Sequence, residues 1–99
     1  MPRESAEKRR REEAEGLAVA ALAFLAADDD RLSAFLAATG LDPGDVRAAA
    51  GQPGFAAGVL DHIASSDELM LAFAAHVEQP PERVAAARML MAGPPPDWP

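Results

Sequence analysis

The sequence predicts an all-α protein, and three features of the chain support that prediction. The chain has 99 residues, which fits one small domain. Alanine, the strongest helix former, occupies 24 positions, whereas the β-branched residues Val, Ile and Thr together occupy only 7. Turn and capping residues recur between the apolar runs. We expect a compact bundle of about six short helices, with two helix–turn–helix units packed around a central apolar helix.

The charge of the chain is unevenly placed. Residues 1–15 hold five basic and five acidic side chains, whereas residues 16–99 hold four arginines and eleven acids and so carry the whole net charge of −7. Opposite charges in residues 1–15 lie four apart, as in Glu7 and Arg11, so a helix would place them side by side. We therefore expect residues 1–15 to form a charged, fraying helical extension rather than an arm for a polyanion or a membrane surface.

Residues 16–27 form the most apolar run of the chain. The run is shorter than the roughly 20 residues that cross a bilayer, and glutamates precede it where a signal peptide would carry positive charge. On a helical wheel its large side chains point in nearly every direction, as in a helix that is buried. We expect the helix from Leu17 to Leu25 to lie at the centre, covered on all sides by the two units.

Two short helices are predicted next, over residues 29–39 and 43–50. The first has an apolar stripe with the spacing i, i+3, i+4, i+7 of a one-sided helix. The second begins with proline, whose fixed φ suits the first helical position. An aspartate precedes each helix as an N-cap and a glycine ends each helix; these residues are Asp28 and Asp42, and Gly40 and Gly51.

The fourth and fifth helices begin at a proline and at a capping box. Pro53 opens the fourth helix, which presents one apolar face. Ser65 and Glu68 have the spacing of a capping box and start the fifth helix, residues 66–77. Leu71 lies opposite the main apolar stripe of the fifth helix, so we expect that helix to be covered on both sides.

A sixth helix and a proline-rich tail complete the chain. Pro81 begins the sixth helix, which runs to about Ala92. Gly93 and three prolines then force an extended tail. The predicted organisation is an extension over residues 1–15, a helical domain over residues 16–93 and a tail over residues 94–99.

The chain also contains an internal repeat. Phe35 and Phe73 lie 38 residues apart, and so do Pro43 and Pro81. The alignment of the two segments predicts a repeated unit made of a striped helix, a tight turn and a helix begun by proline. We expect two such units to pack with approximate twofold symmetry around residues 16–27.

Three stretches together resemble a known family. They are LDPGDVRAAA (41–50), PGFAAGVLDHI (53–63) and DELMLAFAA (67–75). They are similar to the bacterial proteins grouped as domain of unknown function 3572, and the likeness covers roughly residues 15–92. The resemblance implies a small, soluble, all-helical cytoplasmic protein without an assigned activity. Its motifs are caps, turns and core positions, so it transfers no catalytic or binding residue to this chain.

Few side chains favour catalysis. Ser66, His62 and Asp61 make a Ser–His–Asp set on paper, but consecutive helical residues point about 100° apart, so Asp61 cannot readily orient the imidazole of His62. We predict no enzyme activity, no catalytic residue, no cofactor and no cofactor-binding residue.

Binding of a metal or of DNA is a weaker hypothesis. His62 and His76 on antiparallel helices could face one metal or small ligand, but no third ligand clusters with them, so we assign no metal site. The helix over residues 43–50 offers DNA only Arg47, and a charge of −7 opposes phosphate binding. We therefore expect no nucleic-acid partner.

A protein–protein interaction or adaptor module is the predicted function. The apolar residues of the sixth helix spread around its circumference. They either belong to the core, covered by another helix or by the tail, or leave a patch for a partner protein or for a second copy of the chain in a homodimer. The absence of cysteine fits a reducing, cytoplasmic compartment, and no membrane association is expected. The candidate interaction surface consists of Arg88, Met89, Leu90, Met91 and Trp98.

Overall fold

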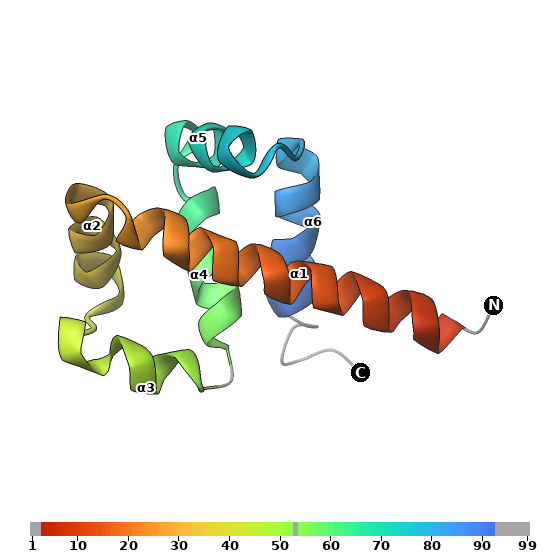
Figure 1. Cartoon of the computed structure of the whole chain (residues 1–99), viewed down its shortest axis with the longest axis horizontal. Helices are drawn as coiled ribbons and strands as arrows, with labels where there is room; N and C mark the ends of the chain where they lie inside the picture. The colour runs from red at the N-terminus through yellow and green to blue at the C-terminus, as the bar shows by residue number, and fades with distance from the viewer. Residues whose placement is uncertain (1–2, 53, 93–99) are drawn as a thin grey trace.

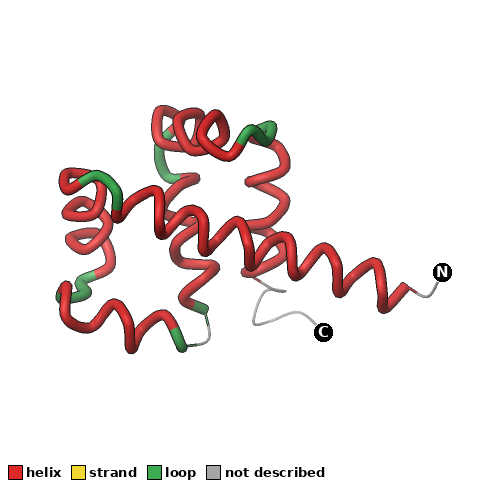
Figure 2. The backbone as a smooth tube through the Cα atoms, in the orientation of Figure 1, coloured by secondary structure: helices red, strands yellow, loops and turns green. Residues whose placement is uncertain are grey.

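In the computed structural model, which describes residues 3–52 and 54–92, the chain forms six α-helices and one 3-10 turn (Figure 1). This part contains no β-strand (Figure 2), so the predicted all-α class is confirmed. Within it, no helix is both long and apolar enough to span a bilayer. The elements are α1 (Arg3–Ala26), α2 (Asp29–Thr39), the 3-10 turn η1 (Pro43–Asp45), α3 (Val46–Ala50), α4 (Phe55–Ala64), α5 (Asp67–Val77) and α6 (Pro81–Ala92).

The helix α1 is the element on which the other helices assemble. It crosses the molecule, and its N-terminal end projects beyond the other helices (Figure 1). Both α4 and α6 pack against α1 and also against each other. Because alanine adds little beyond the backbone, a face made mainly of alanine lets neighbouring helices approach closely. The buried face of α1 consists of Ala14, Ala18, Ala21, Phe24 and Leu25.

The prediction that the central helix is covered on all sides is wrong. Leu25 is fully buried, whereas Val19 is 70% exposed. The reason is that α4 and α6 pack on one side of α1, and Val19 lies at the edge of that contact, beside an open depression. The charged residues before Gly16 and the apolar run after it form one continuous helix.

Aromatic contacts attach α2 and α5 to this centre. Phe24 of α1 packs against Phe73 of α5 with ring centroids 5.5 Å apart. The guanidinium of Arg31 in α2 lies 4.5 Å from the centroid of Phe24. Phe35 of α2 meets Phe55 of α4 edge-on at 6.3 Å. Such pairs add about 0.5–1.5 kcal/mol beyond area burial, and Phe35 and Phe73 are buried core residues, as their stripes predict.

The serine and aspartate caps agree only in part with the predicted helix starts. Asp28 caps α2, because its Oδ1 accepts a hydrogen bond from the backbone N–H three residues later (3.1 Å). The cap of α5 is Ser66, whose Oγ accepts from the N–H three residues later (3.3 Å). Ser65 instead ends α4, where its hydroxyl donates to the carbonyl oxygen of His62 (2.6 Å). The capping box is therefore misplaced by one residue.

The starts of the third and fourth helices also differ from the prediction. Asp42 makes no side-chain capping bond, and the chain first forms a 3-10 turn in which the N–H of Asp45 donates to the carbonyl oxygen of Asp42 (2.9 Å). Pro53 lies outside the described residues. The fourth helix begins at Phe55, after Gly54 with φ of 87°.

The two helix–turn–helix units share the geometry of their turns. Gly40 ends α2 and Glu78 ends α5, and both have left-handed backbones, with φ of 75° and 56°. Each is followed three residues later by a helical turn that begins with proline. The units diverge afterwards, because α3 has five residues and α6 has twelve. The predicted pair of units is thus present, with second helices of unequal length.

Two leucines lie in different environments from those the helical stripes indicate. Leu71 is 58% exposed, so the prediction that α5 is covered on both sides is wrong. Its packing partners α1, α4 and α6 lie on the inner side of α5 alone (Figure 1). Leu60 is fully buried although no predicted stripe includes it. It belongs to α4, which packs between α1 and α6 and therefore buries two of its faces.

The substitution Gly40→Ala should lower the free energy of unfolding by about 1 kcal/mol, because the left-handed backbone at this position strains a residue with a Cβ. The matched control is Gly58→Ala inside α4, where a new Cβ meets nothing within 4 Å. That change should raise the free energy of unfolding by about 0.5–1 kcal/mol. Urea unfolding measures both values, and a shift of the same sign in both variants would contradict this account of the turn.

Candidate functional site

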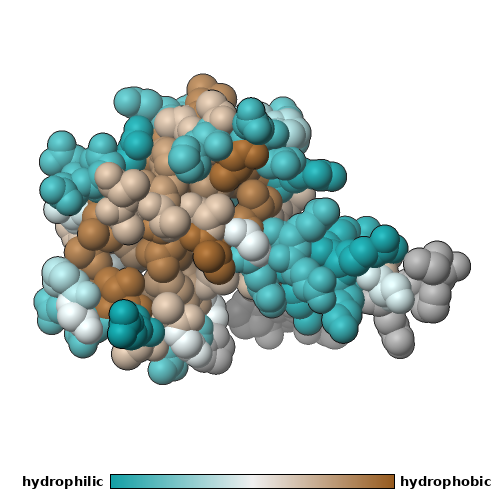
Figure 3. Space-filling model, viewed as in Figure 1, coloured by the Kyte–Doolittle hydropathy of each residue, from teal (hydrophilic) through white to brown (hydrophobic). Residues whose placement is uncertain are grey.

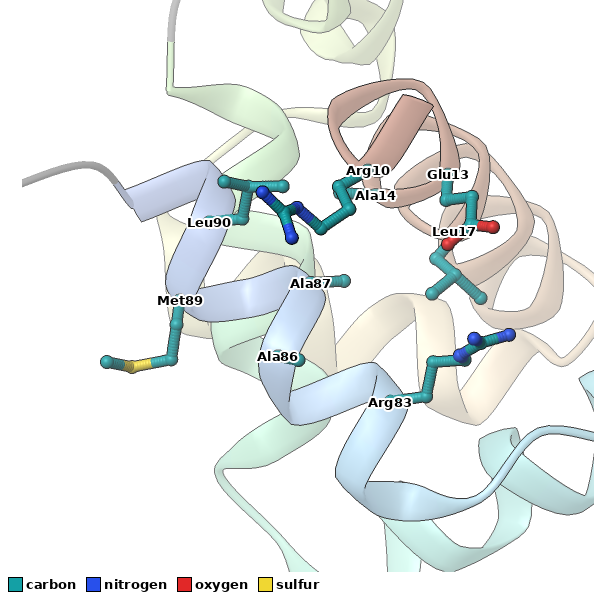
Figure 4. Close-up of a pocket in the computed structure, with 9 residues that line it drawn as sticks. All are labelled: Arg10, Glu13, Ala14, Leu17, Arg83, Ala86, Ala87, Met89 and Leu90. Atoms are coloured by element: carbon teal, nitrogen blue, oxygen red, sulfur yellow. The ribbon is translucent and has the colours of Figure 1, made fainter. Parts of the chain in front are cut away.

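A groove with a volume of about 550 Å³ lies between α1 and α6 (Figure 4). Small side chains line its bottom, where Ala14 of α1 is 1% exposed and Ala87 of α6 is 6% exposed. Ala86 also lines it. These residues have no side-chain atoms beyond Cβ, so the space above them stays open. The groove therefore has a shallow apolar floor between two helices.

The two helices present the same residue pattern to the groove. Arginine, alanine and leucine recur on both at positions i, i+4 and i+7, which share one face of a helix. The helices run in opposite directions here, so Arg10 lies toward Leu90 and Arg83 lies toward Leu17 (Figure 4). Each end of the groove thus has one arginine and one leucine. The two triplets are Arg10, Ala14 and Leu17, and Arg83, Ala87 and Leu90.

The groove is positively charged in an acidic protein. The whole chain has a net charge of −7, whereas Arg10, Arg83 and Glu13 give the lining of the groove a net charge of +1. Among the described residues, neither arginine forms an ion pair with a carboxylate. Arg83 donates a hydrogen bond of 3.4 Å to Oε1 of Gln79. Both guanidinium groups can therefore receive a carboxylate from a ligand.

The predicted surface on the sixth helix is divided among different environments. Met89 is 67% exposed and Leu90 is 37% exposed, and both line the groove against α1. Met91 is half-buried and packs against the core. Trp98 lies outside the described residues. Met89 and Leu90 therefore share the groove, whereas Met91 belongs to the core side of α6.

Arg88, the remaining residue of that predicted surface, faces α4. Its Nε pairs with Oδ1 of Asp61 at 2.5 Å. The Ser–His–Asp set considered in the sequence is therefore not assembled, since Asp61 pairs with Arg88 and the hydroxyl of Ser66 caps α5. His62 belongs to neither interaction.

A second depression lies beside α1. Its volume is about 340 Å³, and it is formed by α1, the start of α4 and the end of α6. Figure 3 shows an apolar surface over the C-terminal half of α1, in contrast to the hydrophilic N-terminal half. The lining of the depression is mostly apolar and includes Val19, Leu22, Phe55 and Met91.

The two histidines pack against different aromatic rings. The imidazole of His62 meets Phe35 edge-on with centroids 5.3 Å apart. The imidazole of His76 lies 5.1 Å from the centroid of Phe24. No group of three His, Cys, Asp or Glu side chains in the described ranges is arranged to hold a metal ion. A site shared by the two histidines therefore lacks a clustered third ligand.

Sequence reasoning missed the α1 side of the groove and the alanines of α6. Apart from Leu17, their side chains are small or charged, so they fall outside a search for large apolar stripes. The signal that could have identified them is the shared spacing of arginine, alanine and leucine in residues 10–17 and 83–90. That spacing has meaning only once the two helices are known to be neighbours.

Burial lowers the pKa of His62 below its ordinary value of 6.5, because a charged imidazole loses hydration there. The unfolded chain therefore takes up this proton at a higher pH than the folded chain. The resulting stabilisation is present above pH 6.5 and is lost as the pH falls through the folded pKa. We expect an NMR titration of His62 to have its midpoint below 6.5. The free energy of unfolding should also fall less steeply with acid in His62→Gln than in the unmodified protein, and a midpoint above 6.5 would contradict this account.

Comparison with known proteins agrees with the resemblance seen in the sequence. Residues 11–94 match the model of the family DUF3572, described as a protein of unknown function. No curated protein and no solved structure matches the chain. The match includes every residue of the groove except Arg10. The chain therefore belongs to the DUF3572 family.

Proposed function

We propose that this protein is a non-enzymatic interaction module that receives a helical segment of a partner protein in the groove between α1 and α6. The observation that carries the proposal is an alanine floor bordered by the exposed side chains of Met89 and Leu90. Exposed apolar side chains beside a concave surface are typical of protein interaction sites. A groove between two helices suits a third helix, which would bury its apolar face there.

The alternative function, binding of a metal or small ligand by His62 and His76, has less support. Each imidazole contacts its own phenylalanine, Phe35 or Phe24. Binding of DNA by α3 has the least support, because Arg47 is the sole basic residue of that five-residue helix. A homodimer remains a second form of the interaction hypothesis.

Photo-cross-linking tests the proposed function. A photoreactive amino acid placed at Met89 should give adducts with defined proteins in an extract of the source cells, whereas the same amino acid at Leu71 should not. Leu71 is a suitable control because it is an exposed apolar residue on α5, away from the groove.

Two matched arginine variants test whether the adducts depend on the groove. Ala86→Arg places a long side chain on its floor and should reduce the Met89 adducts by about tenfold, since a docked helix must bury its apolar face there. Ala85→Arg makes the same chemical change at an exposed neighbour outside the groove, and should leave them unchanged. Equal adducts from positions 89 and 71, or equal effects of the two arginines, would refute the proposal.

A further inference from the structure

We infer that the segment bound in the α1–α6 groove is an acidic amphipathic helix, with one carboxylate on each side of a short stripe of small apolar residues. The inference rests on the proposed function and adds the chemistry of the partner. Three observations support an acidic partner: the charge of the groove, the length of the groove, and the residue pattern repeated on α1 and α6.

The charge of the groove selects an acidic partner. Arg10 and Arg83 are exposed, and neither pairs with a carboxylate in the part of the chain that the structure describes. A guanidinium binds a carboxylate through two parallel hydrogen bonds, which are stronger than neutral ones. Basic partners are attracted instead to the acidic remainder of the molecule, because the chain carries −7 while the groove carries +1.

The length of the groove sets the spacing of the partner's carboxylates. On each helix the arginine and the leucine are seven residues apart, which is about 10 Å along the axis at 1.5 Å per residue. Because Arg10 and Arg83 lie at opposite ends (Figure 4), a docked helix can meet both with acidic residues at i and i+7. Its residues at i+3 and i+4 then face Ala14 and Ala87, where the shallow floor fits alanine or leucine.

The same charges argue against two other occupants. A second copy placed face to face in this groove would bring four arginines together with only two glutamates, Glu13 and its counterpart, which is repulsive. A fatty acid has one carboxylate, so it would leave either Arg10 or Arg83 without a partner. A helix with two separated carboxylates can pair with both arginines, one at each end of the groove.

Three stapled helical peptides of about 18 residues, which form five turns, test the inference. The first carries Glu at i and i+7 with Leu and Ala at i+3 and i+4. The second has the same composition, with its two glutamates moved to the opposite face, and the third has lysines in place of the glutamates. Titration calorimetry with the full chain measures affinity, and NMR shift changes locate the bound peptide.

We expect the first peptide to bind about tenfold more tightly than either control, with shift changes at Ala86 and Leu90. Its affinity should fall with added salt, since exposed charges are screened. In the double variant Arg10→Glu, Arg83→Glu the preference should reverse to the lysine peptide. Both positions are exposed, and circular dichroism verifies that the variant is folded.

Failure of this inference is distinguishable from failure of the proposed function. Equal affinity for all three peptides, or no binding of the first peptide, would overturn the acidic-partner inference. A preference that persists unchanged in the charge-reversed variant would also overturn it. None of these results affects the cross-linking at Met89, which tests the groove with whatever protein the cell supplies.

Discussion

The domain depends on one helix face built from small side chains. Along α1 the buried positions are mostly alanine, which contributes little burial energy itself but allows two other helices to approach the backbone. The larger apolar side chains that occupy this space come from α4 and α6, and burial of each contributes roughly 1.5–3 kcal/mol. The fully or almost fully buried ones are Val59, Leu60, Ile63 and Val84.

The groove follows from the same composition. Where Ala14 of α1 and the alanines of α6 come together, no side chain is long enough to fill the space above the line of contact. The feature that lets the helices pack therefore also leaves an open apolar surface. The arginines at its two ends give that surface a charge opposite to the net charge of the chain.

Local features were predictable from the sequence, and features that depend on neighbours were not. The cap at Asp28 and the left-handed stop at Gly40 each follow from the chemistry of one short segment. The choice between Ser65 and Ser66 was ambiguous because either hydroxyl can cap a helix. The exposure of Val19 depends on which sides of α1 are covered. The groove could not be predicted for the same reason, since the residues that line it on α1 and on α6 are about seventy positions apart in the sequence.

Amide hydrogen exchange along α1, followed by NMR, tests most directly whether the alanine face organises the domain. The account predicts that the amides of residues 14–25, which carry that face, exchange only through global unfolding. The amides of residues 7–9, which are exposed and precede the groove, should exchange about a hundredfold faster or more. Uniform protection along the whole helix, or rapid exchange across residues 14–25, would contradict the central claim.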